Sequence, residues 1–248
     1  MTGIDTVTTN SCVARMPAVH LVNPEGDPMT TVNTLTPDLV QFLCTATEQS
    51  GLPATDVQAM GNPELLRSPL LGFFCSVRCP GKVILHVYDL ADAILETGIT
   101  LVSGFHAPIE QELLWLVLRR DVPVVICVPH RLTGKRIPAA WRPGLDSGRM
   151  LLLSTSGDHA RRTTSGLADQ RNLFAAALAH QVIVASAAPG GHVARLCATL
   201  ARWQKPVATL DEESAGLNCI RPDAFGAWWS MATFAKAVES HSGKSNRR

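Results

Sequence analysis

Four apolar, strand-like runs in this chain each end at a turn of small or glycine residues and lead into an amphipathic helical pattern. These junctions lie at residues 73–81, 101–108, 124–130 and 182–191. Short apolar runs that alternate with helical periods are typical of a parallel sheet covered by helices. The sequence therefore predicts an α/β fold with an open, mostly parallel sheet and helices on both faces.

The turns that follow the four runs are the first place to look for a binding site. In an open sheet of this kind, the carboxyl ends of the strands lie along one edge, and ligands bind there. Ser76, Ser103 and Gly190 each follow one of the apolar runs. We therefore expect these residues to lie close together, although they are far apart in the sequence.

The sequence divides into three regions. Residues 1–66 are predicted to form an irregular amino-terminal stretch, with an extended piece at 18–22, and a small helical segment. The sheet domain is predicted to span residues 67–215. Residues 216–248 are expected to contain a carboxyl-terminal helix, around 224–238, and a frayed tail.

The small helical segment is predicted from its end signals. A helix should begin at Thr36, because Pro37 suits a first turn and Asp38 lies near the positive end of the helix. It should end near Gly51, and a second short helix is expected after Asp56.

Within the sheet domain, helices are predicted at residues 82–97, 108–120, 164–179 and 191–203, with a last strand at 206–210. The apolar residues of the first helix are spaced for one helical face, so we expect them to be buried. They are Val83, Ile84, Val87, Leu90, Ala91, Ile94 and Leu95.

Composition excludes several classes of protein. No stretch approaches the roughly 18 apolar residues of a membrane span, and no secretory signal is visible, so we expect a cytoplasmic protein without membrane association. The seven cysteines lie mostly in apolar runs, which indicates reduced, buried thiols. Cys75 and Cys79 have no second pair at zinc-ligand spacing, so no metal is expected.

The net charge of +1 hides a local excess of basic residues. Such a stretch in a nearly neutral protein indicates an anionic partner, and a solvated basic surface is the alternative. The basic residues of this stretch are Arg131, Lys135, Arg136, Arg142, Arg149, Arg161 and Arg162.

Two of the turns carry features of anion sites. Gly190 and Gly191 precede a helix, so backbone N–H groups and the positive helix end can approach an anion closely. The turn from Ser76 to Gly81 has the same character and adds Arg78. An ordinary tight turn is the alternative for each. Neither turn is a P-loop, and no G-x-G-x-x-G pattern follows the first strand, so we expect no dinucleotide cofactor.

Several segments between residues 61 and 211 occur in a familiar order. Residues 75–78 (Cys-Ser-Val-Arg) stand in place of a strand followed by Gly-Ser-Arg, and 103–110 resemble a Ser-Gly-hydrophobic segment that ends in Ile-Asp. Residues 171–172 (Arg-Asn) precede the strand that leads to the glycine turn at 190–191. In this order and spacing the chain resembles the DprA/Smf family of DNA-processing proteins.

The resemblance implies a Rossmann-like domain that binds single-stranded DNA, helps to load a recombinase and pairs as a homodimer. Phe105 is the one aromatic residue expected at the sheet edge for stacking on a base. Together with the turns and basic residues, the resemblance gives a set of candidate phosphate-binding residues. They are Ser76, Arg78, Ser103, Gly104, Arg161, Arg162, Arg171, Asn172, Gly190 and Gly191.

This chain also departs from the family pattern. Val77 separates Ser76 from Arg78, and His106 to Pro108 replace a segment that carries an arginine and a glycine in the family. The resemblance therefore supports the fold and an anion site more directly than a biological pathway.

Other functions remain open from the sequence. Residues 188–191 (Ala-Pro-Gly-Gly) resemble the Pro-Gly-Gly-x-Gly-Thr turn of the lysine-decarboxylase-like phosphoribohydrolases, but Val193 and Ala194 replace its Gly-Thr and no glutamate follows. His106 and Glu110 could face one another as an acid–base pair, or the histidine could be structural. We expect a binding protein rather than an enzyme. A nucleotide sensor, a nucleotide hydrolase and a protein-interaction scaffold are the alternatives.

Overall fold

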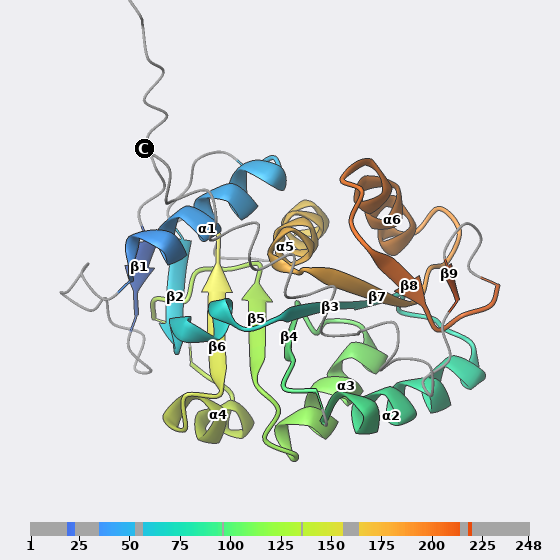
Figure 1. Ribbon diagram of the computed structural model, residues 1–248, viewed down its shortest axis with the longest axis horizontal. Coiled ribbons are helices and arrows are strands. Elements are labelled where there is room, and N and C mark those ends of the chain that lie inside the picture. Colours follow the sequence, from blue (N-terminus) through green and yellow to red (C-terminus); the bar gives the residue numbers. More distant parts are fainter. Residues whose placement is uncertain are drawn as a thin grey trace, which may run out of the picture.

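The computed structural model describes residues 19–22, 35–52, 57–95, 97–134, 136–155, 164–213 and 218–219. In these residues nine strands form one sheet, in the order β1-β2-β6-β5-β4-β3-β7-β8-β9 (Figure 1). Among the described strands, only the β2–β6 pair is antiparallel. The prediction of an open, mostly parallel sheet is confirmed. The strands are β1 (Val19–Leu21), β2 (Val57–Gly61), β3 (Leu70–Cys75), β4 (Thr100–Ser103), β5 (Val124–Val128), β6 (Met150–Ser154), β7 (Gln181–Ser186), β8 (Val207–Thr209) and β9 (Asn218–Cys219).

Helices cover both faces of the sheet, as predicted. On one face lie α1 (Pro37–Gln49), α5 (Ser165–Leu178) and α6 (His192–Arg202) (Figure 1). On the other face lie α2 (Gly81–Leu95), α3 (Pro108–Leu118) and the short α4 (Arg142–Asp146). Two short 3₁₀ helices, η1 (Pro63–Arg67) and η2 (Ala139–Trp141), complete the described elements. No helix among the described residues is long and apolar enough to span a bilayer.

Strand β3 joins the two layers of the core. Its residues Leu71 and Phe73 pack with the α2–α3 side, whereas Leu70 and Phe74 pack with the α1–α5–α6 side. All four side chains are fully buried. A strand that is buried on both faces must be apolar throughout, which explains the continuous run that the sequence shows here.

The strand order reverses beside β3. The chain passes from β3 through β4 and β5 to β6 in one direction, then returns to place β7 on the free side of β3, with β8 and β9 beyond it. The connections that leave β3 and β7 run to helices on opposite faces, α2 and α6. At such a switch point the two loops diverge, and the space between them is where open α/β sheets bind ligands.

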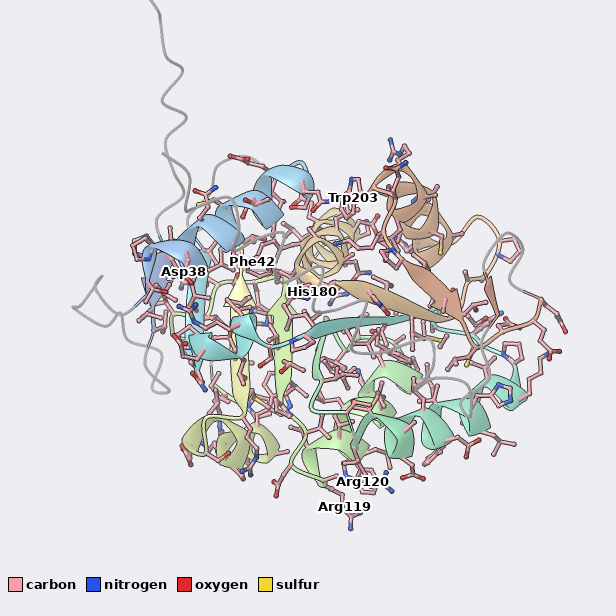
Figure 2. The ribbon with its side chains drawn as sticks, in the orientation of Figure 1. Asp38, Phe42, Arg119, Arg120, His180 and Trp203 are labelled. Atoms are coloured by element: carbon pink, nitrogen blue, oxygen red, sulfur yellow. The ribbon has the colours of Figure 1, made fainter. Side chains whose placement is uncertain are left out.

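The segment before residue 67 is part of the same sheet. Strands β1 and β2 extend one side of it, and α1 lies against α5. Leu39 and Leu43 of α1 are buried, and the Phe42 ring stacks on His180, with ring centroids 6.4 Å apart (Figure 2). The extended piece predicted at 18–22 is confirmed as β1.

One secondary-structure prediction was wrong, one strand was missed, and two side chains expected to be buried are exposed. The short helix expected after Asp56 is strand β2, because Val57–Gly61 pairs antiparallel with β6 and buries its side chains there. Strand β6 was not predicted at all. Ile84 and Leu95 of α2 are exposed rather than buried, since the helix face in contact with the sheet is narrower than the apolar stripe. The helix predicted at 224–238 lies outside the described residues.

The helices predicted at 36–51, 82–97, 108–120, 164–179 and 191–203 are confirmed as α1, α2, α3, α5 and α6. Their ends follow local chemistry. The Thr164 hydroxyl caps α5 by accepting the N–H of Leu167 at 3.3 Å. Proline occupies the first turn of α1 and of α3.

The central position of β3 gives a test of the fold. Replacing Phe74 by alanine should reduce the free energy of unfolding by about 3–5 kcal/mol, because it leaves a cavity between the sheet and α5. Urea denaturation followed by circular dichroism measures this change. Val77→Ala is the control, since Val77 is 70% exposed, and it should change stability by less than about 0.5 kcal/mol. Equal losses in the two variants would contradict this arrangement.

Candidate functional site

The loops after β3 and β7 are joined at the switch point by two hydrogen bonds. The Ser76 N–H donates to the Ser186 carbonyl at 2.9 Å, and the Ala188 N–H donates to the Ser76 hydroxyl at 2.8 Å. The β3–β7 register also shifts between Phe74 and Cys75. The bends after β3 and β7 are therefore held against each other, as their positions after parallel strands predict.

A cavity of about 500 Å³ opens beside these loops, and we call it the switch-point cavity. Its walls come from the loops after β3, β4 and β7 and from the amino-terminal turns of α3, α5 and α6. The residues that line it are Cys75, Ser76, Val77, Arg78, His106, Ala107, Glu110, Ser165, Ala168, Asp169, Arg171, Asn172, Ala188, Gly191, His192 and Val193.

The Glu110 side chain connects two backbone segments that line this cavity. Its carboxylate is buried and accepts the N–H of Cys75 at 2.9 Å, of His106 at 2.7 Å and of Ala107 at 3.1 Å. One acidic side chain thus fixes the end of β3 and the turn before α3. Burial raises the pKa of Glu110, and the three N–H donors and the Arg171 guanidinium partly offset that rise. Because the bond to residue 106 uses its backbone N–H, Glu110 serves here as a backbone cap.

Arg171 is a buried cation at the same site. Its side chain is 5% exposed, and its Nε and Nη2 donate to Asn172 Oδ1 at 3.1 and 2.9 Å. Burial lowers the pKa of Arg171 and the charge of Glu110 raises it, but an arginine remains protonated in proteins. The guanidinium lies against Gly104, where an added Cβ would come within 2.2 Å of Nε. Glycine at 104 is therefore required by the packing of Arg171.

Charged side chains of both signs stand around the mouth of the cavity. Arg78 is exposed on the loop after β3. Asp169 of α5 contacts His192 at 2.5 Å and Arg195 at 3.3 Å, both from α6. Arg195 also donates to the Gly190 carbonyl at 3.2 Å. Because Asp169 is paired with these groups, its negative charge is partly compensated.

The glycine turn after β7 differs in detail from the expected anion cradle. Gly190 has a positive φ of 69°, a conformation that favours glycine. The Gly191 N–H, however, donates to the Ala188 carbonyl at 3.0 Å, and the Ser76 N–H is also used, as described above. The donors that a helix start leaves unpaired belong instead to the first turn of α6, at His192 and Val193, and both residues line the cavity.

The structure brings together half of the ten candidate residues. Ser76, Arg78, Arg171, Asn172 and Gly191 line the switch-point cavity. Three others do not line it. They are Ser103, Gly104 and Gly190. Arg161 and Arg162 lie outside the described residues.

Two residues expected at the edge are packed inside the protein. Ser103 is fully buried, and its hydroxyl accepts the Phe105 N–H at 3.4 Å. Phe105 itself is 5% exposed and belongs to the core on the α2–α3 side, so the prediction that it stacks on a base was wrong. The basic stretch is also divided, since Arg149 precedes β6 at the opposite edge of the sheet and pairs there with Asp121 at 2.6 Å.

Sequence reasoning missed Asp169, His192 and Arg195. Their contacts join α5 to α6, and no local pattern in the sequence marks such a pair. Glu110 was noted for its spacing from His106 and as the last residue of the motif segment 103–110, but not as a cap of the backbone. Its acidic character near the start of a helix could have identified the backbone cap that it forms.

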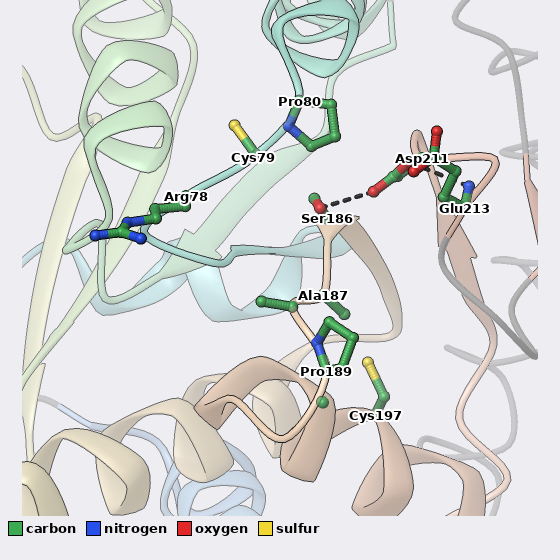
Figure 3. A pocket seen from close by; sticks show the side chains of 11 residues that line it. Arg78, Cys79, Pro80, Ser186, Ala187, Pro189, Cys197, Asp211 and Glu213 are labelled. Atoms are coloured by element: carbon green, nitrogen blue, oxygen red, sulfur yellow. Dashed lines mark hydrogen bonds between the residues drawn. The ribbon is translucent and has the colours of Figure 1, made fainter.

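A second cavity of about 550 Å³ lies on the β8 side of the same loops, and we call it the β8-side cavity (Figure 3). Its polar end is built around Asp211, which accepts the Ser186 hydroxyl at 2.7 Å and the Glu213 N–H at 3.2 Å. The two cavities share Arg78 and Ala188. The residues that line the β8-side cavity are Arg78, Cys79, Pro80, Ser186, Ala187, Ala188, Pro189, Ala194, Cys197, Asp211 and Glu213. No cluster of metal-ligating side chains occurs in the described part of the chain.

Comparison with solved structures identifies the fold. DNA processing protein A (DprA) from Streptococcus pneumoniae matches with a TM-score of 0.57 and 21% identity, over 68% of this chain and 65% of that protein. The chain has a DprA-like fold. A DprA from Helicobacter pylori, described as binding single-stranded DNA, matches with a TM-score of 0.56 and 16% identity, over 80% of this chain and 92% of that one. No protein-family model and no curated protein sequence matches the chain.

These comparisons confirm the resemblance in fold that the motifs indicated. The chain spans about two thirds of the length of the S. pneumoniae DprA. In this DprA-like fold, the motif segments at residues 75–78 and 190–191 both lie at the β3–β7 switch point, although strands β4, β5, β6 and β7 separate them along the chain. Their shared position comes from the strand order rather than from sequence proximity.

The role of Glu110 can be tested by its amide analogue. Glu110→Gln should lower the free energy of unfolding by about 1–3 kcal/mol, because the amide NH₂ faces backbone donors and leaves buried N–H groups unpaired. Glu112→Gln on the same helix is the matched control, since Glu112 accepts a hydrogen bond from the exposed Tyr88 hydroxyl, and it should cost less than about 1 kcal/mol. Chemical denaturation measures both.

The raised pKa of Glu110 also predicts a pH dependence. In the folded chain the Glu110 carboxyl group keeps its proton to a pH above the ordinary pKa of 4.5. In the unfolded chain it loses that proton near pH 4.5. The contribution of Glu110 to stability is therefore complete below pH 4.5 and is lost as the pH rises through the folded-state pKa. Glu110→Gln should remove this part of the pH profile. An unchanged profile in the variant would contradict the assignment.

Proposed function

We propose that this chain binds single-stranded nucleic acid with little dependence on sequence, and that it holds phosphates at the switch-point cavity. The observation that carries the proposal is the convergence of Arg78 and Arg171, from separate elements, on one cavity at the switch point of a DprA-like fold. The description of the H. pylori DprA as a single-stranded DNA-binding protein supports the choice of ligand.

The proposed contacts follow from charge and exposure. Arg78 is exposed, so it can bind a phosphate directly, with a geometry that suits two hydrogen bonds. Arg171 is buried beside Asn172 in the wall of the cavity, so its charge attracts an anion into the cavity. The first N–H groups of α6, at His192 and Val193, add donors and the positive end of the helix.

Other candidates take a different place in the proposal. Ser76 and Gly191 shape the loops through their hydrogen bonds, Gly104 leaves room for Arg171, and Ser103 supports the turn after β4. Gly190 provides the left-handed turn before α6. Arg161 and Arg162 remain candidates from the sequence, as the residues between β6 and α5 that would add positive charge.

The family resemblance extends the proposal to a cellular role and to partners. A role in DNA processing or recombination, a recombinase partner and a homodimer follow from the family pattern described above. Of these parts, the nucleic-acid site is the one that residue chemistry supports.

A nucleotide sensor is the second candidate, because a cavity of about 500 Å³ falls in the size range of small-molecule sites. A phosphoribohydrolase has less support. The carboxylate nearest the cavity floor, Glu110, already accepts three backbone N–H groups.

The nucleic-acid proposal predicts binding that weakens steeply with salt. Fluorescence anisotropy with labelled single-stranded DNA should give a linear fall of log K with log salt, with a slope of about −0.7 for each phosphate contacted. Arg78→Ala should weaken binding to all sequences alike and make the slope shallower by about one contact. The matched control is Arg119→Ala, because Arg119 stacks on Trp115 at 4.5 Å, at the far end of α3 (Figure 2).

Arg171 requires a gentler change, since the residue is buried. Arg171→Lys keeps the charge but loses the paired contacts to Asn172, and it should weaken binding less than Arg78→Ala does. No binding of wild type at low salt would reject the proposal. A thermal shift with a mononucleotide but none with an oligonucleotide would favour the sensor instead, and sequence-selective loss in Arg78→Ala would place that residue on a base.

A further inference from the structure

One nitrogen of the Arg171 side chain is free to bind a ligand in the switch-point cavity. Nε and Nη2 donate to Asn172 Oδ1, but Nη1 has no hydrogen-bond partner among the described residues. In that part of the chain, the fully enclosed side-chain atoms without a partner are Thr100 Oγ1 and Gln181 Oε1, so Nη1 is not sealed inside the protein. Arg171 is 5% exposed and lines the cavity. Its Nη1 therefore offers two N–H donors there.

The start of α6 adds backbone donors to the same cavity. Glu110 caps the turn before α3, and Thr164 caps the start of α5. No side chain caps the start of α6. The first N–H groups of a helix have no partner within it, so those of His192 and Val193 can bind a ligand, together with the positive end of the helix.

The acidic side chains at this cavity already have partners, whereas its two arginines have no acidic one. Both oxygens of Glu110 accept backbone N–H groups, and both oxygens of Asp169 contact side chains of α6. Arg78 and Arg171 form no direct ion pair with an acidic side chain of the described residues. An anionic ligand can therefore supply the partner that these two cations lack.

The burial of Arg171 distinguishes two kinds of phosphate. An internal phosphodiester has a sugar on each side, so a strand must enter and leave the cavity to bring that group to Arg171. A terminal phosphate has a single link to the strand and three free oxygens, and its charge near pH 7 is about −1.5 to −2. A terminal phosphate is therefore the better partner for a buried arginine, while the exposed Arg78 can reach either kind.

We propose that the switch-point cavity receives the terminal phosphate of a single strand. Arg171 Nη1 and the first N–H groups of α6 bind its oxygens, and Arg78 binds an internal phosphate at the mouth of the cavity. This inference rests on the function proposed above and adds to it a preference for phosphorylated ends. The 5′ and 3′ ends of a strand present the same phosphate chemistry, so the experiment includes both.

Three oligo(dT) strands with an internal fluorescent label test this proposal by anisotropy at fixed salt and pH 7.5. One carries a 5′-phosphate, one a 3′-phosphate, and the third is unphosphorylated but one nucleotide longer, so all have the same number of phosphate groups. Wild type should bind a phosphorylated strand about tenfold tighter or more than the third, as one added charge-assisted hydrogen bond predicts. Equal affinity for all three would overturn this inference and leave the proposed function intact. Binding of none would overturn the proposed function itself.

Two arginine variants separate the terminal phosphate from the internal one. Arg171→Lys should reduce the preference for a phosphorylated end to within about threefold, because an ammonium group does not reproduce the guanidinium fork. Arg78→Ala should weaken binding of all three strands by a similar factor and keep the preference. The reverse result, with the preference lost in Arg78→Ala and kept in Arg171→Lys, would overturn the assignment of Arg171.

A third variant fills the cavity without changing its charge. Ala168→Leu enlarges a side chain that lines the cavity, so it should abolish the preference for a phosphorylated end while the unphosphorylated strand still binds. Gln170→Leu is the matched control, because Gln170 is exposed on the same helix and does not line the cavity, and it should keep the preference. An unchanged preference in Ala168→Leu would place the terminal phosphate elsewhere and overturn the inference.

Discussion

Strand β3 is buried on both faces and lies between β4 and β7, and the geometry of the site follows from that position. Because the strand order reverses here, the loop after β3 runs to one face of the sheet and the loop after β7 runs to the other. Two loops that diverge cannot fill the space between them, so the carboxyl edge is hollow at this point. Both cavities of the candidate site lie along these two loops.

A hollow of this kind needs internal support, which polar groups provide. The Glu110 carboxylate holds the end of β3 to the turn before α3, and the Ser76 hydroxyl holds the loop after β3 to the loop after β7. Arg171 fills the space that Gly104 leaves. Each of these polar groups is buried, so the hydrogen bonds that satisfy them also fix their positions. The site is therefore formed by the fold before any ligand binds.

The gathering of charged side chains at the two cavities is another property that arises from the fold. Arg78 and Arg171 come from a loop and a helix separated by β4, β5 and β6 in the sequence, and Asp211 follows β8. In sequence, these residues belong to regions of mixed charge, and the overall net charge is only +1. In space, Arg78 and Arg171 line the switch-point cavity together with Glu110 and Asp169, and Asp211 and Glu213 line the β8-side cavity. The fold therefore brings charges of both signs together at the carboxyl edge of the sheet.

The features that were predicted correctly depend on interactions between near neighbours, and those that were missed depend on contacts between distant segments. The helices were predicted well because proline, threonine and charged residues at their ends act within one turn. Strand β2 was mistaken for a helix, since its five residues are too few to show a period and its partner β6 is about 90 residues away. Ser103 and Phe105 were placed at the binding edge because they follow a strand, yet the turn there directs both side chains into the core.

The sequence by itself determined the fold class, the approximate ends of most helices and the residue types available to bind an anion, because each depends on interactions between near neighbours. Only the tertiary structure decided the strand order, the use of the Ser76 and Gly191 N–H groups inside the loops, and the pairing of Asp169 with His192 and Arg195. These features depend on which distant segments meet. That choice is made by burial of the whole sheet between two layers of helices, which no local pattern encodes.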